Sequence, residues 1–243
     1  MAHTRDHRSS PKGGEEWAER NRIERVYKAY SSDPYYRKIW TDDAARYMVE
    51  RKWEEIRLAL DREKIALERA TLLDLGAGEG GDCDRFGQFG FRRERIVALD
   101  VLLDSLRKGR TEHGWLAAIQ AEGVHLPFQD ATFNVVYQST MLSSVLDQGR
   151  RRRILREVQR VLAPGGLFVS YDTRYPNPWN RNTHPVSAAE VRDAFPRCQV
   201  RSRSTTPIPQ LVRLFRGLPR SALRAMEWIP LLRSHRLVVV RMP

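Results

Sequence analysis

The sequence predicts an α/β protein in which a mostly parallel sheet carries helices on both faces. From residue 71 onward, short apolar runs alternate with amphipathic helical segments, the pattern of repeated strand–helix units. The 243 residues are enough for one large domain with a substantial core. A composition of 41% hydrophobic and 30% charged residues is typical of a globular chain.

Two helical segments are expected before the alternating region. Apolar residues recur at helical spacing in residues 15–29 and 42–67. Pro34 separates these segments, because proline disfavours a helical conformation at the residue before it. Residues 1–14 hold no apolar core, so we expect a disordered tail there and no secretory signal.

The alternating region is expected to begin with a strand over residues 71–75. Further strands are expected at 95–99, 116–121, 132–138, 167–172, 199–204 and 235–241. Helices are expected from about residue 80 and over 101–110, 150–162, 186–195 and 211–229, the last broken at Pro219. Pro164-Gly165-Gly166 predicts a turn before the fifth strand, and the arginine run 150–153 a solvated helix start.

Cysteine content and charge narrow the class of protein. Cys83 and Cys198 lie far apart without metal-ligand spacing, which suits a reducing cytoplasm and predicts neither a disulfide framework nor a metal site. No run reaches the roughly 20 apolar residues of a membrane span. Residues 197–243 carry ten arginines and one acid, Glu227, and so hold +9 of the net charge of +12. Any argument for an anionic partner therefore rests on that segment.

The stretch TLLDLGAGEGG (71–81) places a glycine-rich loop directly after the first strand of the alternating region. Glycines let backbone approach a ligand closely. Two interpretations compete at this point: G-x-G-x-x-G, a dinucleotide fingerprint, and D-x-G-x-G-x-G, an S-adenosylmethionine motif. The first uses Gly76, Gly78 and Gly81, and the second uses Asp74, Gly76, Gly78 and Gly80.

The charges beside this loop favour the second interpretation. A pyrophosphate binds best at a helix N-terminus without acids, whereas Glu79, Asp82 and Asp84 lie in the first turn. S-adenosylmethionine instead carries a sulfonium and an ammonium group, which acids attract. Asp74 at the end of the strand would suit that ammonium group, directly or through water.

Four motifs, in their order and spacing, resemble the class I S-adenosylmethionine-dependent methyltransferases, in particular the small-molecule, type 11-like branch. They are LLDLGAGEG (72–80), RIVALD (95–100), AEGVHLPFQDATFNVV (121–136) and LREVQRVLAPGGLFVSYD (155–172). The resemblance implies a Rossmann-like seven-stranded methyltransferase fold, mostly parallel with an antiparallel last strand. We expect this domain over 68–243, with a helical insertion at 207–232 and an N-terminal helical lid at 15–67.

The resemblance also implies the residues that bind the cofactor, S-adenosylmethionine, and its product, S-adenosylhomocysteine. Asp100 would hold the ribose hydroxyls, and Glu122, where the family usually has Asp, the adenine amino group. The other implied contacts are Asp74, Gly76, Ala77, Gly78, Val101, Gly123 and Gln138. Structural alternatives stay open: Asp100 as a helix cap, Glu122 as a solvated acid, and Gln138 as a structural amide.

The loop 171–184, after the fifth strand, offers candidates for the acceptor side. Methyl transfer depends mainly on holding the nucleophile in a dry site, and a base is needed only when the acceptor must lose a proton. His184 is the candidate base because imidazole titrates near neutral pH, although it could be an ordinary loop histidine. Asp172 could orient a base or bind hydroxyls. The candidate acceptor-binding residues are Arg174, Tyr175, Trp179, Asn180, Tyr30 and Tyr35, the last two from the lid.

Residues 210–236 allow two interpretations. A basic and apolar helix pair can lie on an anionic membrane, which would make the protein cytoplasmic and peripheral at the inner membrane face. Alternatively, the segment caps the acceptor pocket and exposes its arginines to solvent. A looser resemblance to methyltransferases encoded with bacterial surface-glycan genes points to a small-molecule, sugar or lipid-linked glycan hydroxyl as acceptor.

Other classes of function are less well supported. The fourth strand ends in YQSTMLSS rather than an N-P-P-Y type motif, so nucleic-acid substrates are disfavoured despite the positive charge. A nicotinamide-dependent oxidoreductase that uses Gly76, Gly78 and Gly81 remains an alternative. A non-catalytic, methyltransferase-like membrane adaptor is another, although retention of Asp74, Asp100 and Glu122 argues against it.

Overall fold

The computed structural model describes residues 11–114, 117–177, 180–215 and 217–243. The chain divides into two compact units, Met1–Asp42 and Asp43–Pro243. The first unit contains helices α1 (Pro11–Ser32) and α2 (Pro34–Thr41). Helix α1 begins within residues 1–14, where the sequence predicts a disordered tail, and residues 1–10 lie outside the described part of the chain. Asp33 is extended between them, as Pro34 predicts, and its side chain accepts a hydrogen bond from the Tyr35 N–H. A new helix begins at Pro34 itself, because proline is favourable in the first turn of a helix.

Helix α3 (Asp43–Glu63) belongs to the larger unit. Ile56 and Leu60 on α3 are fully buried in a cluster with sheet residues. The compact division therefore falls between residues 42 and 43, whereas the sequence had placed it after residue 67. The lid role of residues 15–67 stays a prediction.

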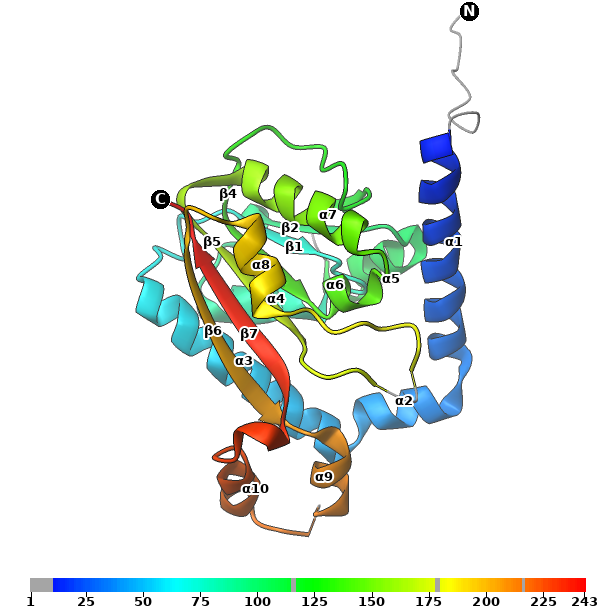
Figure 1. Ribbon diagram of the computed structural model, residues 1–243, viewed down its shortest axis with the longest axis vertical. Helices are drawn as coiled ribbons and strands as arrows, with labels where there is room; N and C mark the ends of the chain where they lie inside the picture. Colours follow the sequence, from blue (N-terminus) through cyan, green and yellow to red (C-terminus); the bar gives the residue numbers. More distant parts are fainter. Residues whose placement is uncertain (1–10, 115–116, 178–179, 216) are drawn as a thin grey trace, which may run out of the picture. The chain divides into compact units, whose positions relative to one another are not determined.

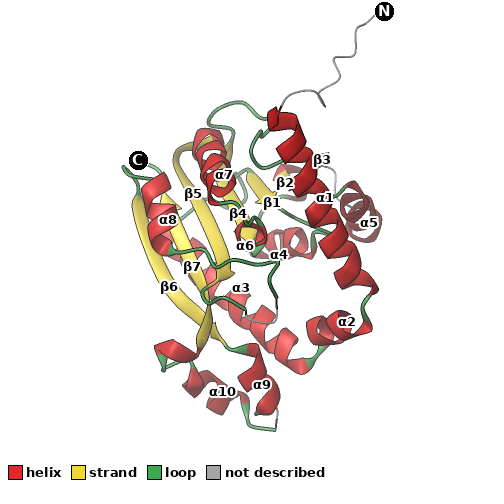
Figure 2. Cartoon of the chain, turned by 45° about the vertical axis from the view of Figure 1, so that its right-hand side comes forward, coloured by secondary structure: helices red, strands yellow, loops and turns green. Residues whose placement is uncertain are grey.

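A seven-stranded sheet forms the centre of the larger unit (Figures 1 and 2). The strand order is β3-β2-β1-β4-β5-β7-β6, and β7 runs antiparallel to both of its neighbours while the remaining pairs are parallel. The predicted fold class, with an antiparallel last strand, is confirmed. The strands are β1 (Leu72–Leu75), β2 (Ile96–Asp100), β3 (Ala117–Gln120), β4 (Phe133–Ser139), β5 (Leu162–Thr173), β6 (Gln199–Pro207) and β7 (Arg233–Arg241).

Helices cover both faces of this sheet, because side chains alternate between the faces along each strand. In β4, Val136 faces one core cluster, and Val135 and Tyr137 face the other. The Val136 face packs against α7 (Gln148–Val161) and α8 (Ala188–Ala194), and the opposite face against α3, α4 (Gly81–Phe89) and α5 (Leu103–His113). Three short elements complete this part of the unit: α6 (Met141–Ser144) and the 3-10 turns η2 (Arg93–Arg95) and η3 (Pro230–Leu232).

Strand β5 begins immediately after α7, so Pro164-Gly165-Gly166 does not form the turn predicted for it. The β4–β5 register shifts between Phe133 and Val135, and the three residues lie in the resulting bulge. Gly165 has a φ of +68°, and a Cβ atom on Gly166 would lie 2.8 Å from the Ala163 carbonyl oxygen. Glycine is therefore required by the shape of the bulge.

The helical insertion consists of α9 (Pro209–Leu214) and α10 (Arg220–Met226), which confirms the predicted break at Pro219. Val212 and Leu223 form a small apolar cluster with Tyr47 of α3. Arg51 of α3 donates two hydrogen bonds of 2.8 Å to the carboxylate of Glu227. These contacts fasten the insertion to the start of α3.

Candidate active site

Acidic residues mark the carboxyl ends of three neighbouring strands. Asp74 lies in β1, Asp100 ends β2, and Glu122 follows β3. The parallel register pairs Asp74 with Ala98, and the Ala121 N–H donates to the Asp100 carbonyl at 3.1 Å. The three acids therefore lie along one edge of the sheet, beside the crossover between β1 and β4, where ligands bind in such folds.

The glycine loop turns sharply at this edge. Gly76 and Gly78 have φ values of +79° and +56°. The N–H groups of Gly76 and Ala77 both donate to the Leu99 carbonyl, at 2.8 and 3.0 Å. A Cβ atom on Gly76 would lie 2.5 Å from Cγ of Met141, whereas a Cβ on Gly78 would meet nothing within 4 Å. The loop thus packs tightly on α6 at Gly76 and opens to free space at Gly78.

Asp100 connects the glycine loop to β2. Its Oδ2 atom accepts from the Gly78 N–H and its Oδ1 atom from the Leu102 N–H, each at 2.8 Å. Burial raises the pKa of Asp100, and these N–H donors oppose the rise. Helix α5 begins at Leu103 with Leu102 as its N-cap and without a side-chain cap bond, so Asp100 orders the chain before the helix but does not cap it. Each carboxylate oxygen nevertheless keeps accepting capacity, which suits a vicinal diol.

Glu122 is ion-paired and not simply a solvated acid. Its partner is Arg150, a buried residue in the first turn of α7. Arg151 is also buried, and it bonds to Glu190 at 2.6 Å and to the Val145 carbonyl at 2.9 Å. The predicted solvated helix start is therefore wrong for Arg150 and Arg151, because acids from other segments face them.

Asp74 points into a buried polar cluster beneath the loop. It is 2% exposed and accepts a long contact of 3.4 Å from the Cys83 thiol. Burial and then the nearby charge of Asp82 raise the pKa of Asp74 well above its ordinary value. Asp82 itself accepts from Lys52 at 2.8 Å and from the Tyr137 hydroxyl at 2.7 Å. A cation bound at the loop would favour the ionised form of Asp74.

Gln138 and Asp172 form a hydrogen-bond network inside the fold. The Gln138 amide donates to Ser170 at 2.6 Å and to Asp172 at 3.2 Å, and its oxygen accepts from the Met141 N–H at 3.0 Å. Asp172 also accepts from the Ser143 N–H at 3.1 Å. Burial raises the pKa of Asp172 to about 6. Both side chains hold α6 in place, which is the structural role that the sequence left open for Gln138.

Helix α6 contacts both the glycine loop and the loop that follows β5. Met141 packs against Gly76, and two residues later the Ser143 carbonyl accepts from the His184 N–H at 2.8 Å. The backbone of His184 is therefore fixed to the same short helix that supports the glycine loop.

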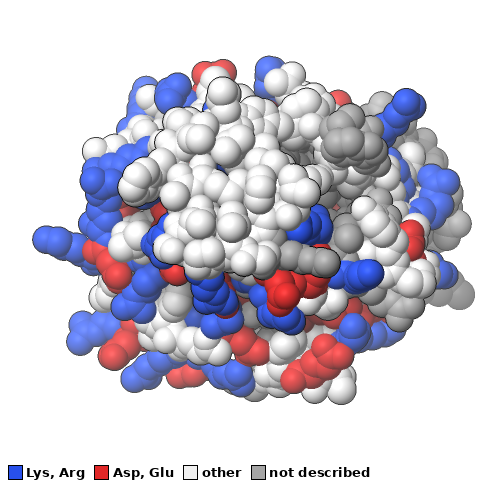
Figure 3. Space-filling view, turned by 90° about the horizontal axis from the view of Figure 1, so that it is seen from below, with Lys and Arg blue, Asp and Glu red and all other residues white. Residues whose placement is uncertain are grey.

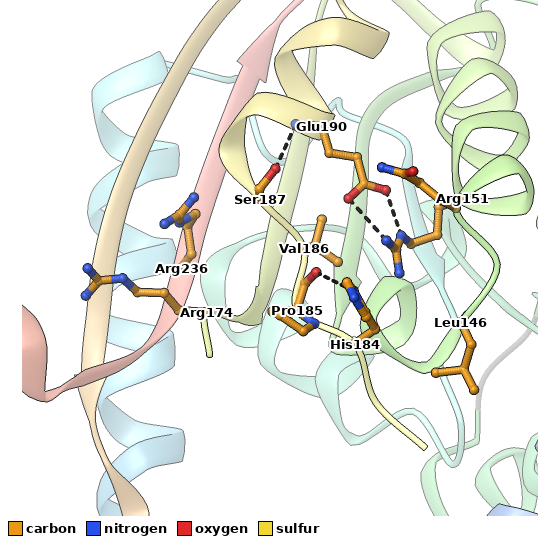
Figure 4. Close-up of a pocket in the computed structure, with 10 residues that line it drawn as sticks. Leu146, Arg151, Arg174, His184, Pro185, Val186, Ser187, Glu190 and Arg236 are labelled. Atoms are coloured by element: carbon orange, nitrogen blue, oxygen red, sulfur yellow. Dashed lines mark hydrogen bonds and ion pairs between the residues drawn. The ribbon is translucent and has the colours of Figure 1, made fainter. Parts of the chain in front are cut away.

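A pocket of about 400 Å³ opens beside His184 (Figure 4). The His184 ring contacts the Pro185 carbonyl through Nδ1 at 3.1 Å. Of the residues expected on the acceptor side, His184 and Arg174 line this pocket, and Asp172, Tyr175 and Asn180 do not. The pocket is also lined by Leu146, Arg151, Glu190 and Arg236, which the sequence did not single out.

The remaining acceptor-side candidates among the described residues do not line this pocket. Tyr175 donates to the Leu231 carbonyl at 3.3 Å, and the Asn180 side chain accepts from the Asn182 N–H at 3.0 Å. Tyr30 and Tyr35 belong to the first unit, where Tyr35 is 65% exposed. Trp179 lies outside the described residues. Within the described part of the chain, no group of three or more His, Cys, Asp or Glu side chains could hold a metal ion.

Comparisons with known proteins agree with this geometry. Residues 73–170 match a family described as a methyltransferase domain. The chain is 35% identical over 98 residues to the demethylmenaquinone methyltransferase of Streptomyces griseus, covering 40% of each chain. It is 30% identical over 144 residues to the ubiquinone/menaquinone biosynthesis C-methyltransferase UbiE of Hahella chejuensis, covering 57% of this chain and 53% of that protein. The chain spans about half the length of the curated relatives that it matches.

Solved structures show the same fold. The chain is similar to a Haloferax volcanii methyltransferase determined in complex with the Trm112 methyltransferase activator, with a TM-score of 0.60 and 24% identity. This match covers 82% of this chain and 94% of that one. An S-adenosylmethionine-dependent methyltransferase from Mesorhizobium loti is similar with a TM-score of 0.54 and 19% identity, over 76% and 96% of the two chains. At these identities the similarity concerns the fold.

Proposed function

We propose that this class I S-adenosylmethionine-dependent methyltransferase methylates an oxygen atom of a small molecule, sugar or lipid-linked glycan. One observation carries the proposal: α6 packs against Gly76 of the glycine loop and also fixes His184 at the pocket. A donor bound at the loop and an acceptor bound in the pocket would thus both lie against α6, with the methyl group and the nucleophile meeting beside this helix. The match of residues 73–170 to a methyltransferase domain supports the donor side.

The residues at the loop fit the proposed cofactor. When bound, S-adenosylmethionine supplies a sulfonium methyl group as the electrophile. We assign Asp100 to the ribose hydroxyls, Glu122 to the adenine amino group and Asp74 to the ammonium group. The free space in front of Gly78 and the remaining accepting capacity of Asp100 support this assignment. The backbone of Gly76, Ala77, Gly78, Val101 and Gly123 would complete the site.

On the acceptor side, His184 is the proposed base. A carbonyl oxygen only accepts hydrogen bonds, so the contact with Pro185 places the proton on Nδ1 and leaves the Nε2 lone pair available. Nε2 could then take the proton from an acceptor hydroxyl. Asp172 would act on His184 indirectly, through Ser143. Asp172 accepts a hydrogen bond from the Ser143 N–H, and the Ser143 carbonyl accepts one from the His184 N–H. We therefore propose Asp172 as a positioning residue.

A second candidate function is methylation of a carbon atom on a quinone-type ring. The names of the relatives from Streptomyces griseus and Hahella chejuensis favour it. The two functions differ in product: a methyl ether or ester arises from oxygen methylation, and a new carbon–carbon bond arises from ring methylation.

We also propose that the insertion contacts an anionic membrane surface. Leu214, Trp228 and Leu231 are 72%, 81% and 71% exposed, and Phe215, Leu218 and Ile229 are exposed nearby. Figure 3 looks onto the side of α9 and α10 and shows a broad uncharged area bordered by charged side chains, Lys and Arg together with some Asp and Glu. None of the residues that line the described pocket belongs to residues 207–232, which favours a surface contact over a pocket cap. Among the described residues, no helix has both the length and the hydropathy needed to cross a membrane.

A label-transfer assay tests the proposed function. Purified protein, methyl-labelled S-adenosylmethionine and extract of the source cells are combined, and label is followed into organic-soluble, water-soluble and macromolecular fractions. Label in a small molecule or glycolipid, on oxygen, is the expected result. Label on a ring carbon would replace the first candidate function by the second, and label mainly in RNA or protein would overturn both.

His184→Gln should lower kcat by about 100-fold with little change in cofactor affinity, since general-base catalysis contributes roughly 10²–10⁴ in rate. The matched control is His125→Gln, an exposed histidine that does not line the pocket. Equal activity of the two variants would remove His184 from the proposed mechanism.

A further inference from the structure

Two arginines line the pocket without a carboxylate partner. Within the described part of the chain, neither Arg174 nor Arg236 forms an ion pair with an acid, although both are only partly exposed. The Arg174 guanidinium donates to the carbonyl oxygens of Pro230 and Arg233, and it lies 4.7 Å from the Tyr175 ring centroid. Carbonyls and an aromatic ring orient this group, but they leave its positive charge uncompensated.

Arg236 is more exceptional, because among the described residues its guanidinium makes neither an ion pair nor a hydrogen bond. Its cross-strand partner in the β5–β7 ladder is Asp172. That carboxylate turns instead toward α6 and accepts from Gln138 and Ser143. Both guanidinium groups line the same pocket, and burial and then the charge of Arg174 lower the pKa of Arg236.

The other charged groups of the pocket neutralise each other. Arg151 and Glu190 form a two-point ion pair, with N–O distances of 2.6 and 3.3 Å. Figure 4 shows this pair on one side of the pocket and Arg174 with Arg236 on the other, with His184 and Pro185 between them. The two unpaired guanidinium groups therefore set the net charge of the pocket.

We propose that Arg174 and Arg236 form a binding subsite for a phosphate group carried by the methyl acceptor. A phosphate dianion would neutralise both positive charges, whereas a single carboxylate would neutralise only one of them. Guanidinium groups are the side chains best suited to phosphate, since they present several N–H donors in a plane. The pocket volume of about 400 Å³ leaves room for the rest of a small acceptor beside His184. The identity of the bound molecule as an acceptor rests on the proposed function, but binding of phosphate does not.

Binding is measured by calorimetry on the full chain, with inorganic phosphate and glycerol phosphate as probes and acetate as comparator, at constant ionic strength. The wild-type protein is expected to bind both phosphates with millimolar or tighter Kd and acetate at least several-fold more weakly. Arg236→Gln should weaken phosphate binding at least tenfold, and Arg236→Lys should retain an intermediate affinity. Arg192→Gln, an exposed arginine on α8 that does not line the pocket, should bind as the wild type does.

Two further measurements test the source of the phosphate and the folding of the variant. Vesicles containing phosphatidic acid are compared with phosphatidylglycerol vesicles of equal charge. If the phosphate is a lipid headgroup, the wild type prefers phosphatidic acid, and Arg236→Gln loses this preference together with binding of glycerol phosphate. S-adenosylhomocysteine affinity should be unchanged in Arg236→Gln, which shows that the variant is folded and that its defect lies in the pocket. Equal phosphate binding by wild type and Arg236→Gln, or none by the wild type, would overturn the subsite. Phosphate binding without any methyl transfer would instead overturn the proposed function and leave the subsite standing.

Discussion

The Asp100 carboxylate accepts a hydrogen bond of 2.8 Å from the backbone N–H of Gly78, and this contact joins the two halves of the candidate cofactor site. The same carboxylate accepts from the Leu102 N–H. One side chain thus fixes the shape of the glycine loop and offers its remaining accepting capacity to the open space in front of Gly78.

Asp100→Ala should therefore weaken S-adenosylhomocysteine binding by about 10- to 100-fold, because hydrogen bonds to a charged group contribute roughly 1.5–3 kcal/mol. Calorimetric titration measures the change. Asp104→Asn is the matched control, since its carboxylate is 94% exposed on the following helix. Unchanged affinity in Asp100→Ala would place the cofactor elsewhere.

Replacing glycines by alanine should affect the free energy of unfolding and the cofactor affinity differently at different positions. Gly114, which follows α5 and lies outside the loop, is the control. Gly114 and Gly78 both have positive φ and open space around a Cβ, so each replacement should cost about 1–2 kcal/mol of stability. Of these two variants, only Gly78→Ala should also lose cofactor affinity. Gly76→Ala should cost a further 1–3 kcal/mol, roughly, because its Cβ would overlap Met141. Urea unfolding and cofactor titration of the three variants check this order, and equal unfolding midpoints for Gly76→Ala and Gly114→Ala would contradict the tight packing on α6.

Because the Asp172 carboxyl group is buried, the stability of the fold should fall as the pH rises through the pKa of this group. Its folded-state pKa is raised to about 6, above the ordinary value of 3.8, because the carboxyl group is buried. The stability that this group contributes is fully present below about pH 4 and is lost as the pH rises through 6. The loss amounts to roughly 3 kcal/mol, at 1.36 kcal/mol for each pKa unit.

Asp172→Asn should remove this dependence, so the difference in unfolding free energy between variant and wild type should shift in favour of the variant between pH 4 and pH 7. Urea midpoints across this range provide the measurement. Asp193→Asn, an exposed acid on α8, should follow the wild-type curve. If the curves of Asp172→Asn and wild type run parallel, the Asp172 carboxyl is not the buried titrating group that its contacts indicate.

The exposed apolar side chains of the insertion predict binding to anionic vesicles. Replacing Trp228 and Leu231 by serine should reduce binding to phosphatidylglycerol vesicles more than tenfold, because each large side chain gains roughly 1.5–3 kcal/mol on burial. Flotation measures the bound fraction. Leu58→Ser removes a leucine that is 58% exposed on α3 and should leave binding unchanged. Equal loss in both variants, or no binding by the wild type, would contradict a membrane contact at this face.

The sequence predicted the sheet well because its signals are local. Apolar runs such as Val135–Tyr137 and Phe168–Val169 mark buried strands, and the glycine loop marks the end of the first strand of the sheet. Placement of Asp74, Asp100 and Glu122 along one edge follows from parallel strands alone. Their individual roles toward the cofactor stay predictions.

The missed features depend on contacts between distant segments. Helix α6 has four residues, too few to show a helical repeat of apolar residues in the sequence. Hydrogen bonds from its backbone to Gln138 and Asp172 hold it in place. Arg236 reaches the pocket because β7 inserts between β5 and β6, which no local pattern reveals. The burial of Arg150 and Arg151 likewise depends on acids that are about 30 to 40 residues away.

The assignment of all other cofactor contacts depends on the glycine loop binding S-adenosylmethionine. Calorimetric titration of the full chain with S-adenosylhomocysteine and, separately, with NAD tests this binding. Saturable binding of S-adenosylhomocysteine at one site per chain, with no heat from NAD, is the expected result. Binding of NAD in its place would assign the loop to a dinucleotide and exclude S-adenosylmethionine as its ligand.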